Sequence, residues 1–269
     1  MTDTSKLNKS DRRRLVIATL IFLAVTTVVA VTARDSGLTW DEAIYFDSGV
    51  RYLEWFRNLS GDSFSEQAIG ATWFQPDHPP LAKVWIAFSL ALFRDAFGPI
   101  AGARVGAGVL FGLAAATIFL YLSGRGRARE GIIAALAFVL MPRVFAHGHF
   151  ANLEMLTLLL WMLTIMAFAK GLESRVWSVA CGALFGLALL TKINGAFLPI
   201  VLVPWGILFH GRKAIRNIIF MAVLGPLFFF GLWPVMWHHP ILASKGYLAN
   251  KLARSIVPTY YLGTTYANT

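Results

Sequence analysis

The sequence is poor in cysteine and in acidic residues. Cys181 is the single cysteine, so an intramolecular disulfide is excluded, and its apolar surroundings say nothing about the redox compartment. Asp and Glu number 14 against 24 Lys and Arg. The sequence also lacks a P-loop, a GxGxxG pattern and a GxSxG pattern. Sites of the nucleotide-binding, dinucleotide-binding and serine-hydrolase types therefore have no support in the sequence.

Hydrophobic residues, in contrast, make up 57% of the chain, and its mean hydropathy is +0.62. Soluble domains are about 45–50% apolar. Several apolar runs reach the roughly 20 residues that a helix needs to cross a bilayer. We therefore predict an all-α polytopic membrane protein. The net charge of +10 is then explained by basic residues in cytoplasmic loops, where membrane proteins concentrate Lys and Arg. Nucleic-acid binding is not expected, because the sequence has no basic, aromatic-rich soluble module.

The positions of the basic residues predict how the chain threads through the membrane. Residues 12–14 are three arginines ahead of the first apolar run, so residues 1–14 are predicted to be a cytoplasmic tail. Residues 15–237 are predicted to form one multi-span membrane domain with about seven spans. These are residues 15–31, 99–122, 131–141, 153–169, 176–190, 197–209 and 218–237. With this threading, each short arginine-rich loop falls on the cytoplasmic side.

Two long segments fall on the outer side. The first outer loop, residues 34–98, contains a further apolar stretch at 81–97. Only one crossing can separate this loop from the basic loop at 124–129, so residues 81–97 are expected to form an interfacial or partly inserted helix. The chain closes with a predicted outer loop at 238–269. Because no terminating span or polar tail follows, we expect the sequence to be a fragment of a longer protein.

The first outer loop is the acidic part of the chain. Residues 34–80 hold eight of the 14 acids but only three of the 24 bases. Asp41 and Glu42 stand side by side directly after the first span. They could act only as first-turn acids of a helix capped by Thr39, or a carboxylate of the pair could act in catalysis.

The other predicted outer segments add further ionisable residues, which are His78, Lys83, Arg143, His147, Glu154 and Lys192. Charged groups at membrane depth are costly and are functional candidates. Each also has a structural alternative. The histidines could be solvated, Lys192 could snorkel, and Glu154 could be a first-turn acid. Arg143 could anchor to a lipid phosphate. No HExxH or CxxC spacing accompanies the histidines, so no metal and no cofactor is predicted, with a dependence on a divalent ion left open.

Taken together, these residues favour transfer chemistry on a lipid-phosphate substrate. A carboxylate at the membrane face can take a proton from an acceptor hydroxyl, which contributes typically ~10²–10⁴ in rate. Cations beside it can stabilise the departing phosphate. The candidates for catalysis are Asp41, Glu42 and Glu154. The candidates for substrate binding are His78, Lys83, Arg143, His147 and Lys192.

Four motifs in order give the chain a resemblance to a known family. They are TWDEAIY at 39–45, PDHPPLAK at 76–83, PRVFAHGHFANLEM at 142–155 and GLALLTKINGAFLP at 186–199. The chain resembles the dolichyl-phosphate-mannose protein O-mannosyltransferases and their bacterial relatives, within the broader GT-C superfamily that includes the lipid A aminoarabinose transferases. The resemblance extends over most of residues 35–265 and rests above all on HPPLAK and the Asp-Glu pair.

The resemblance implies a GT-C-like, multi-span, inverting glycosyltransferase that uses a polyprenyl-phosphate sugar. Asp41 then corresponds to the catalytic base, with Glu42 beside it. Lys83 corresponds to a lysine near the donor phosphate, and Arg143 to the arginine that opens the second outer loop. The acid that heads the fourth span is usually Asp in the family, and here it is Glu154, whose side chain is one methylene longer.

The predicted function is therefore transfer of mannose or a similar sugar from a polyprenyl-phosphate donor to an acceptor hydroxyl on the outer or lumenal face. The acceptor could be a protein, a glycan or a lipid. The membrane would be the bacterial plasma membrane, or the endoplasmic reticulum membrane in a eukaryote. Two alternatives stay open, namely a transporter or flippase of lipid-linked sugars and a non-catalytic assembly subunit. A transporter would be expected to carry charges near mid-span and paired broken helices.

The predicted threading can be tested with topology reporters. A reporter fused at Gly126 is expected to be cytoplasmic, because this residue lies within the arginine-rich loop. A reporter fused at Asp62 is expected to be external. Protease protection in spheroplasts or sealed vesicles would measure both, and an external Gly126 would contradict the placement of the carboxylates on the outer face.

Overall fold

The computed structural model describes the whole chain except residues 1–7, 74–76, 254–258, 262–263 and 267–269. Half of the predicted tail and ten residues of the predicted final outer loop, 254–258, 262–263 and 267–269, therefore lie outside the described residues. The described part is helical, which confirms the predicted fold class. One short hairpin is added near its end, where β1 (Thr259–Tyr261) pairs antiparallel with β2 (Thr264–Tyr266).

Each of the seven predicted spans corresponds to an apolar helix. Five are long and apolar enough to cross a membrane, namely α1 (Lys9–Thr32), α5 (Pro99–Ser123), α8 (Glu154–Gly171), the continuous Ile193–His210 and α11 (Arg212–Gly231). Ile193–His210 consists of η2 (Ile193–Phe197) and α10 (Leu198–His210). The sixth is a bent pair, α6 (Ala128–Leu140) and α7 (Pro142–Gly148). The seventh, α9 (Arg175–Leu189), is apolar but has only 15 residues.

The bend between α6 and α7 measures 74° and follows from the sequence. Pro142 restricts the residue before it to extended conformations, and Met141 has φ −64° and ψ 118°. The helix therefore ends at Leu140 and a new one starts in a different direction at Pro142. This turn carries Arg143 away from the axis of the span.

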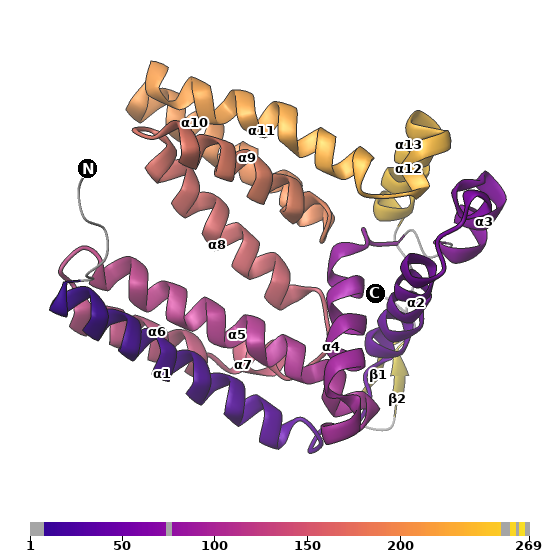
Figure 1. Ribbon diagram of the computed structural model, residues 1–269, viewed down its shortest axis with the longest axis horizontal. Helices are drawn as coiled ribbons and strands as arrows, with labels where there is room; N and C mark the ends of the chain where they lie inside the picture. The colour runs from indigo at the N-terminus through magenta and orange to yellow at the C-terminus, as the bar shows by residue number, and fades with distance from the viewer. Residues whose placement is uncertain (1–7, 74–76, 254–258, 262–263, 267–269) are drawn as a thin grey trace.

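The apolar helices lie side by side, with α1 and α6 packed on α5 and with α9 between α8 and α11 (Figure 1). The start of α1 and the turns after α5, α8 and α10 gather at one end of this bundle, which we call the basic end. At the other end, α2 (Trp40–Arg57) and α4 (Leu81–Phe97) run across the spans (Figure 1). We call this the α2–α4 end. The helix expected at 81–97 is thus present as α4.

Two glycines let neighbouring helices approach α5 closely. A Cβ atom built on Gly106 would lie 2.5 Å from Ser89 of α4, and one on Gly108 would lie 2.8 Å from Val29 of α1. Small residues at helix contacts are typical of membrane proteins, where close packing replaces the hydrophobic driving force. Two glycines of α5, two residues apart, therefore allow close contact with two different helices.

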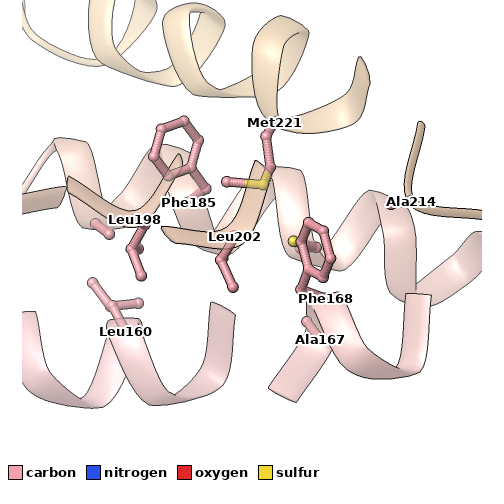
Figure 2. Close-up of a cluster of buried hydrophobic side chains, with 10 residues drawn as sticks. Leu160, Ala167, Phe168, Phe185, Leu198, Leu202, Ala214 and Met221 are labelled. Atoms are coloured by element: carbon pink, nitrogen blue, oxygen red, sulfur yellow. The ribbon is translucent and has the colours of Figure 1, made fainter. Parts of the chain in front are cut away.

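A second packing centre joins α8 to α11 (Figure 2). Phe168 of α8, Phe185 of α9 and Met221 of α11 belong to this one buried cluster. The other labelled members are Leu160, Ala167, Leu198, Leu202 and Ala214. This cluster fixes α8 and the turn after α9, which carry two of the predicted site residues.

Four short helices complete the α2–α4 end, namely η1 (Gly61–Phe64), α3 (Glu66–Thr72), α12 (Val235–His238) and α13 (Pro240–Leu252). An aromatic cluster packs the first predicted outer loop against the last one. Tyr52 stacks on Trp73 at 4.0 Å between ring centroids, and Trp233 meets the edge of Tyr247 at 5.2 Å within the same cluster. The two loops therefore form one packed unit over the ends of the spans.

A buried ion pair ties α2 to α5. Arg104 donates from Nε and Nη2 to the two carboxylate oxygens of Glu42, each at 2.7 Å, and both side chains are fully buried. The other three N–H groups of Arg104 donate to the carbonyl oxygens of Ala33, Ser36 and Gly37. All five donors of the guanidinium are thereby used.

Glu42 also accepts three further hydrogen bonds. The N–H and hydroxyl of Thr39 bind one carboxylate oxygen, and the N–H of Ala151 binds the other at 2.9 Å. Burial raises the pKa of Glu42, but the hydrogen bonds from Arg104, Thr39 and Ala151 outweigh burial and hold the pKa below its ordinary value. The charged pair therefore connects α2, α5, the end of α1 and the segment before α8.

Removal of one partner of this pair is expected to destabilise the fold strongly. In Glu42→Gln the shape is kept but the Arg104 charge is left buried and unpaired, which costs roughly 3–5 kcal/mol. Unfolding in mixed micelles would measure the change. The matched variant Asp47→Asn breaks the exposed pair with Arg51 and should cost less than about 1 kcal/mol. A loss for Glu42→Gln as small as that of the control would mean that the pair does not organise this end.

Candidate functional site

The predicted site residues all belong to the α2–α4 end of the bundle, but they divide into two groups. One group lines an open cavity, and the other lies in the first predicted outer loop beside it, where only Asp41 is exposed. The two groups differ in their exposure and in their hydrogen bonding.

A cavity of about 780 Å³ opens between α7, α8 and the turn that follows α9. Its polar lining consists of Arg143, His147, Glu154, Lys192 and Asn194. Much of its apolar wall is one face of α8, made of Met155, Leu158, Trp161, Met162 and Ile165. These α8 residues recur at the spacing of a single helix face. The cavity is therefore amphipathic, with ionisable groups at its α2–α4 end and an apolar wall that extends along a span.

Glu154 and Lys192 form an ion pair at the polar part of the cavity. Lys192 Nζ donates to Glu154 Oε1 at 2.7 Å, and both side chains are partly exposed. Lys192 lies in extended backbone between α9 and η2, and Glu154 is the first residue of α8. The pairing neutralises much of the charge of both groups.

Asn152 links Glu154 to His147. Its side-chain oxygen accepts from the Glu154 N–H at 3.1 Å, and its side-chain nitrogen donates to His147 Nδ1 at 3.0 Å. Because the amide nitrogen can only donate, Nδ1 is the acceptor and the ring proton is on Nε2. His147 is thereby held at the cavity lining in a fixed tautomer.

Arg143 is the cation of the cavity with the fewest restraints. It lies on α7, is exposed, and makes no hydrogen bond or ion pair with any residue that the structure describes. Its guanidinium presents donors that match a phosphate or a carboxylate. The unpaired charge makes the polar part of the cavity suitable for an anion.

In the second group, Lys83 is fully buried in α4 and donates to Asp77 Oδ1 at 2.9 Å. Its ammonium lies 5.9 Å from the centre of the Tyr45 ring. Burial lowers the pKa of Lys83, and the carboxylate of Asp77 only partly opposes this. Lys83 is not among the residues that line the cavity.

His78 is held as a neutral imidazole beside this pair. Burial lowers its pKa to about 4, and the charges of Lys251, Lys192 and Lys83 act in the same direction, while Asp77 opposes them. Its Nδ1 is buried and has no hydrogen-bond partner among the described residues. The three lysines come from α13, the turn after α9, and α4, so they bring positive charge around one imidazole.

Tyr45 lies between the two groups. Burial and the negative charges of Asp41, Asp77 and Glu154 all raise the pKa of its hydroxyl. Three carboxylates from three segments therefore surround this residue. A hydrogen bond from the Leu81 N–H to the Leu190 carbonyl, at 3.0 Å, joins α4 to the end of α9 and keeps the two groups together.

The structure separates the two acids of the opening motif. Asp41 is exposed and has no hydrogen bond or ion pair within the described part of the chain, whereas Glu42 is completely buried in its pair with Arg104. Successive residues on a helix differ by about 100° in direction, which explains the difference. Of the two acids, Asp41 is the one that an incoming molecule can reach.

Two residues that contact or surround the candidate site are not among those predicted from the sequence. Arg104 lies within a predicted apolar span, although a charge inside such a span is itself a signal for a buried partner. Lys251 lies in the predicted final outer loop, outside the motifs. Its position near His78 depends on how α13 packs against the aromatic cluster, and no local pattern reports that packing.

No group of three or more His, Cys, Asp or Glu side chains lies together as metal ligands in the described part of the chain. His147 and Glu154 are engaged with Asn152 and Lys192 instead. The site is thus built from ion pairs, one free guanidinium and one exposed carboxylate.

Comparison with known proteins adds one match. A model of the family described as dolichyl-phosphate-mannose-protein mannosyltransferase matches residues 77–238. The matched segment begins at Asp77 and includes the whole lining of the cavity. Neither the curated proteins nor the solved structures give a significant match.

Proposed function

This chain belongs to the dolichyl-phosphate-mannose-protein mannosyltransferase family, and from that premise we propose that it transfers mannose or a similar sugar from a polyprenyl-phosphate donor to a hydroxyl group of a protein. Membership makes it a membrane glycosyltransferase of the mannosyltransferase type. The observation that carries the finer proposal is the amphipathic cavity, whose polar part and apolar wall match the two halves of a lipid-linked sugar.

In this proposal the donor phosphate binds between Arg143 and Lys192. Arg143 supplies an unpaired guanidinium, and Lys192 supplies an ammonium that Glu154 holds in position. A phosphate near lipid needs charge-assisted hydrogen bonds, because burial without them is costly. The prenyl chain then lies along the α8 wall that includes Leu158 and Met162.

Asp41 is the proposed general base. Its carboxylate takes the proton of the acceptor hydroxyl while the hydroxyl oxygen bonds to the anomeric carbon from the face opposite the phosphate. The bond between that carbon and the phosphate oxygen breaks, and its electron pair leaves with the polyprenyl phosphate. Arg143 and Lys192 stabilise this charge. A single displacement of this kind inverts the anomeric configuration.

The remaining predicted residues act by position and charge in this scheme. Glu42 fixes the start of α2 through Arg104 and so sets the place of Asp41. Lys83 and His78 lie behind Tyr45, where a buried cation and a neutral imidazole shape the field on the acceptor side. His147 supports Glu154 through Asn152.

The sidedness and the membrane belong to the proposal as well. Acceptor and donor meet at the α2–α4 end, which we place on the outer or lumenal face of a plasma membrane or an endoplasmic reticulum membrane. The charge of Arg104 within α5 does not support the transporter alternative. All five of its N–H groups donate to protein acceptors, so none is left for a transported substrate.

Asp41→Asn tests the base. The substitution keeps the shape of the side chain and removes only the proton acceptor, so turnover is expected to fall about 10²-fold or more while donor binding is kept. The measurement is sugar transfer by the native protein in proteoliposomes, with mannosyl-phosphoryl-polyprenol as donor. Asp47→Asn, which changes another exposed acid of α2, should keep its turnover. Near-normal turnover of Asp41→Asn would assign the role of base to Glu154, or leave Asp41 with no role beyond the first turn of α2.

Arg143→Gln tests the donor site. Loss of a charge-assisted hydrogen bond, worth roughly 1.5–3 kcal/mol, should weaken binding of the polyprenyl-phosphate donor about tenfold or more. Equilibrium binding of a fluorescent donor analogue would report it. Arg57→Gln removes an exposed arginine of α2 that does not line the cavity and should bind donor normally. Equal affinities of all three proteins would place the phosphate elsewhere.

A further inference from the structure

A second charged cavity lies at the basic end, at the opposite end of the spans from the proposed donor site. It has a volume of about 550 Å³ and opens between the start of α1, the end of α5 and the start of α6. Three arginines line it, Arg13 and Arg14 from α1 and Arg129 from α6. Basic residues near the ends of spans are ordinary in membrane proteins, but a cavity that several of them line together is a separate feature.

The three arginines differ in what they bind. Arg14 pairs with Asp11 and donates to the Ser123 carbonyl oxygen at 3.5 Å, so it ties α1 to the end of α5. Arg13 and Arg129 are exposed and make no hydrogen bond or ion pair with residues that the structure describes. Two uncompensated guanidinium groups from different helices thus line one cavity, where a single anion could bridge them.

The backbone at the cavity also suits an anion. Gly126 has φ +77°, which turns the chain tightly between α5 and α6. The 13-residue helix α6 starts two residues later at Ala128, and both residues line the cavity. The N-terminus of a helix presents free N–H groups and a partial positive charge.

Besides two serines, Ser10 and Ser123, the cavity has an apolar part that belongs to spans. Ile17 of α1, Phe119 of α5 and Ile132 of α6 contribute to it. A soluble anion such as inorganic phosphate has no apolar atoms that could contact these side chains, whereas the glycerol and first acyl carbons of a lipid can pack on them. Basic pockets between membrane helices are known to suit anionic head groups.

We propose that this cavity binds the phosphodiester head group of an anionic phospholipid of the leaflet at the basic end. Arg13 and Arg129 hold the phosphate, and Ile17 and Ile132 contact the start of the acyl chains. The bound lipid would join α1 to α6, which otherwise each pack on α5. This site is independent of the glycosyl-transfer site at the other end.

The test uses the purified chain in mild detergent and native mass spectrometry with phosphatidylglycerol or phosphatidylcholine. We expect the wild-type protein to retain phosphatidylglycerol in preference to phosphatidylcholine. In Arg13→Gln/Arg129→Gln, retention should fall about tenfold. The control Arg212→Gln/Lys213→Gln removes two exposed charges at the same end but outside the cavity, and it should retain the lipid as the wild type does.

Several outcomes would overturn the proposal. An equal fall in both double variants would assign the retention to general surface charge. Equal retention of the two lipids by the wild type, which needs no variant to fold, would exclude a head-group site. Displacement of phosphatidylglycerol by millimolar inorganic phosphate or glycerol phosphate would identify a site for soluble anions. A rise in thermal unfolding temperature with phosphatidylglycerol, absent with phosphatidylcholine and lost in the first double variant, supports the proposal by a second measurement.

Discussion

The charge of Arg104 is the constraint on which the α2–α4 end depends. A guanidinium on an apolar, closely packed helix must find partners for all its donors, because an unpaired buried charge is very costly. It finds them in the Glu42 carboxylate and in three carbonyl oxygens of the segment between α1 and α2. That segment is thereby drawn down onto α5. The direction of α2, and with it the exposure of Asp41, follows from where these partners lie.

Two electrostatic environments then lie next to each other. On one side, Lys83 and His78 are buried, and desolvation lowers the pKa of both. On the other side, the cavity keeps Glu154 and Lys192 partly exposed and leaves Arg143 uncompensated. The electrostatic field of the buried side therefore changes little when a ligand binds. The open side has the Arg143 charge, which an anionic ligand can neutralise. Tyr45 is the boundary between the two.

Hydropathy and the basic loops were sufficient to predict seven apolar helices, the helix at 81–97 and the set of loops that meet at one end. The side-chain contacts that distinguish the candidate site residues from one another could not be predicted from hydropathy and charge. The helical turn between Asp41 and Glu42 predicts that they face different directions, but which of the two is buried depends on Arg104, 62 residues from Glu42. Lys83 belongs to a motif that predicts contact with the donor phosphate, yet its side chain ends against Asp77. Such outcomes depend on tertiary packing, which local periodicity does not encode.

The aromatic cluster of Tyr52, Trp73, Trp233 and Tyr247 has a consequence for biogenesis. The segment that carries α2 and α3 is synthesised long before α12 and α13. Until α11 to α13 have been synthesised, Tyr52 and Trp73 lack the aromatic contacts of Trp233 and Tyr247, and Lys251 is not yet near His78. The earlier spans would therefore be inserted while the α2–α4 end is incompletely packed, and this end could pack fully only after α13 had been made.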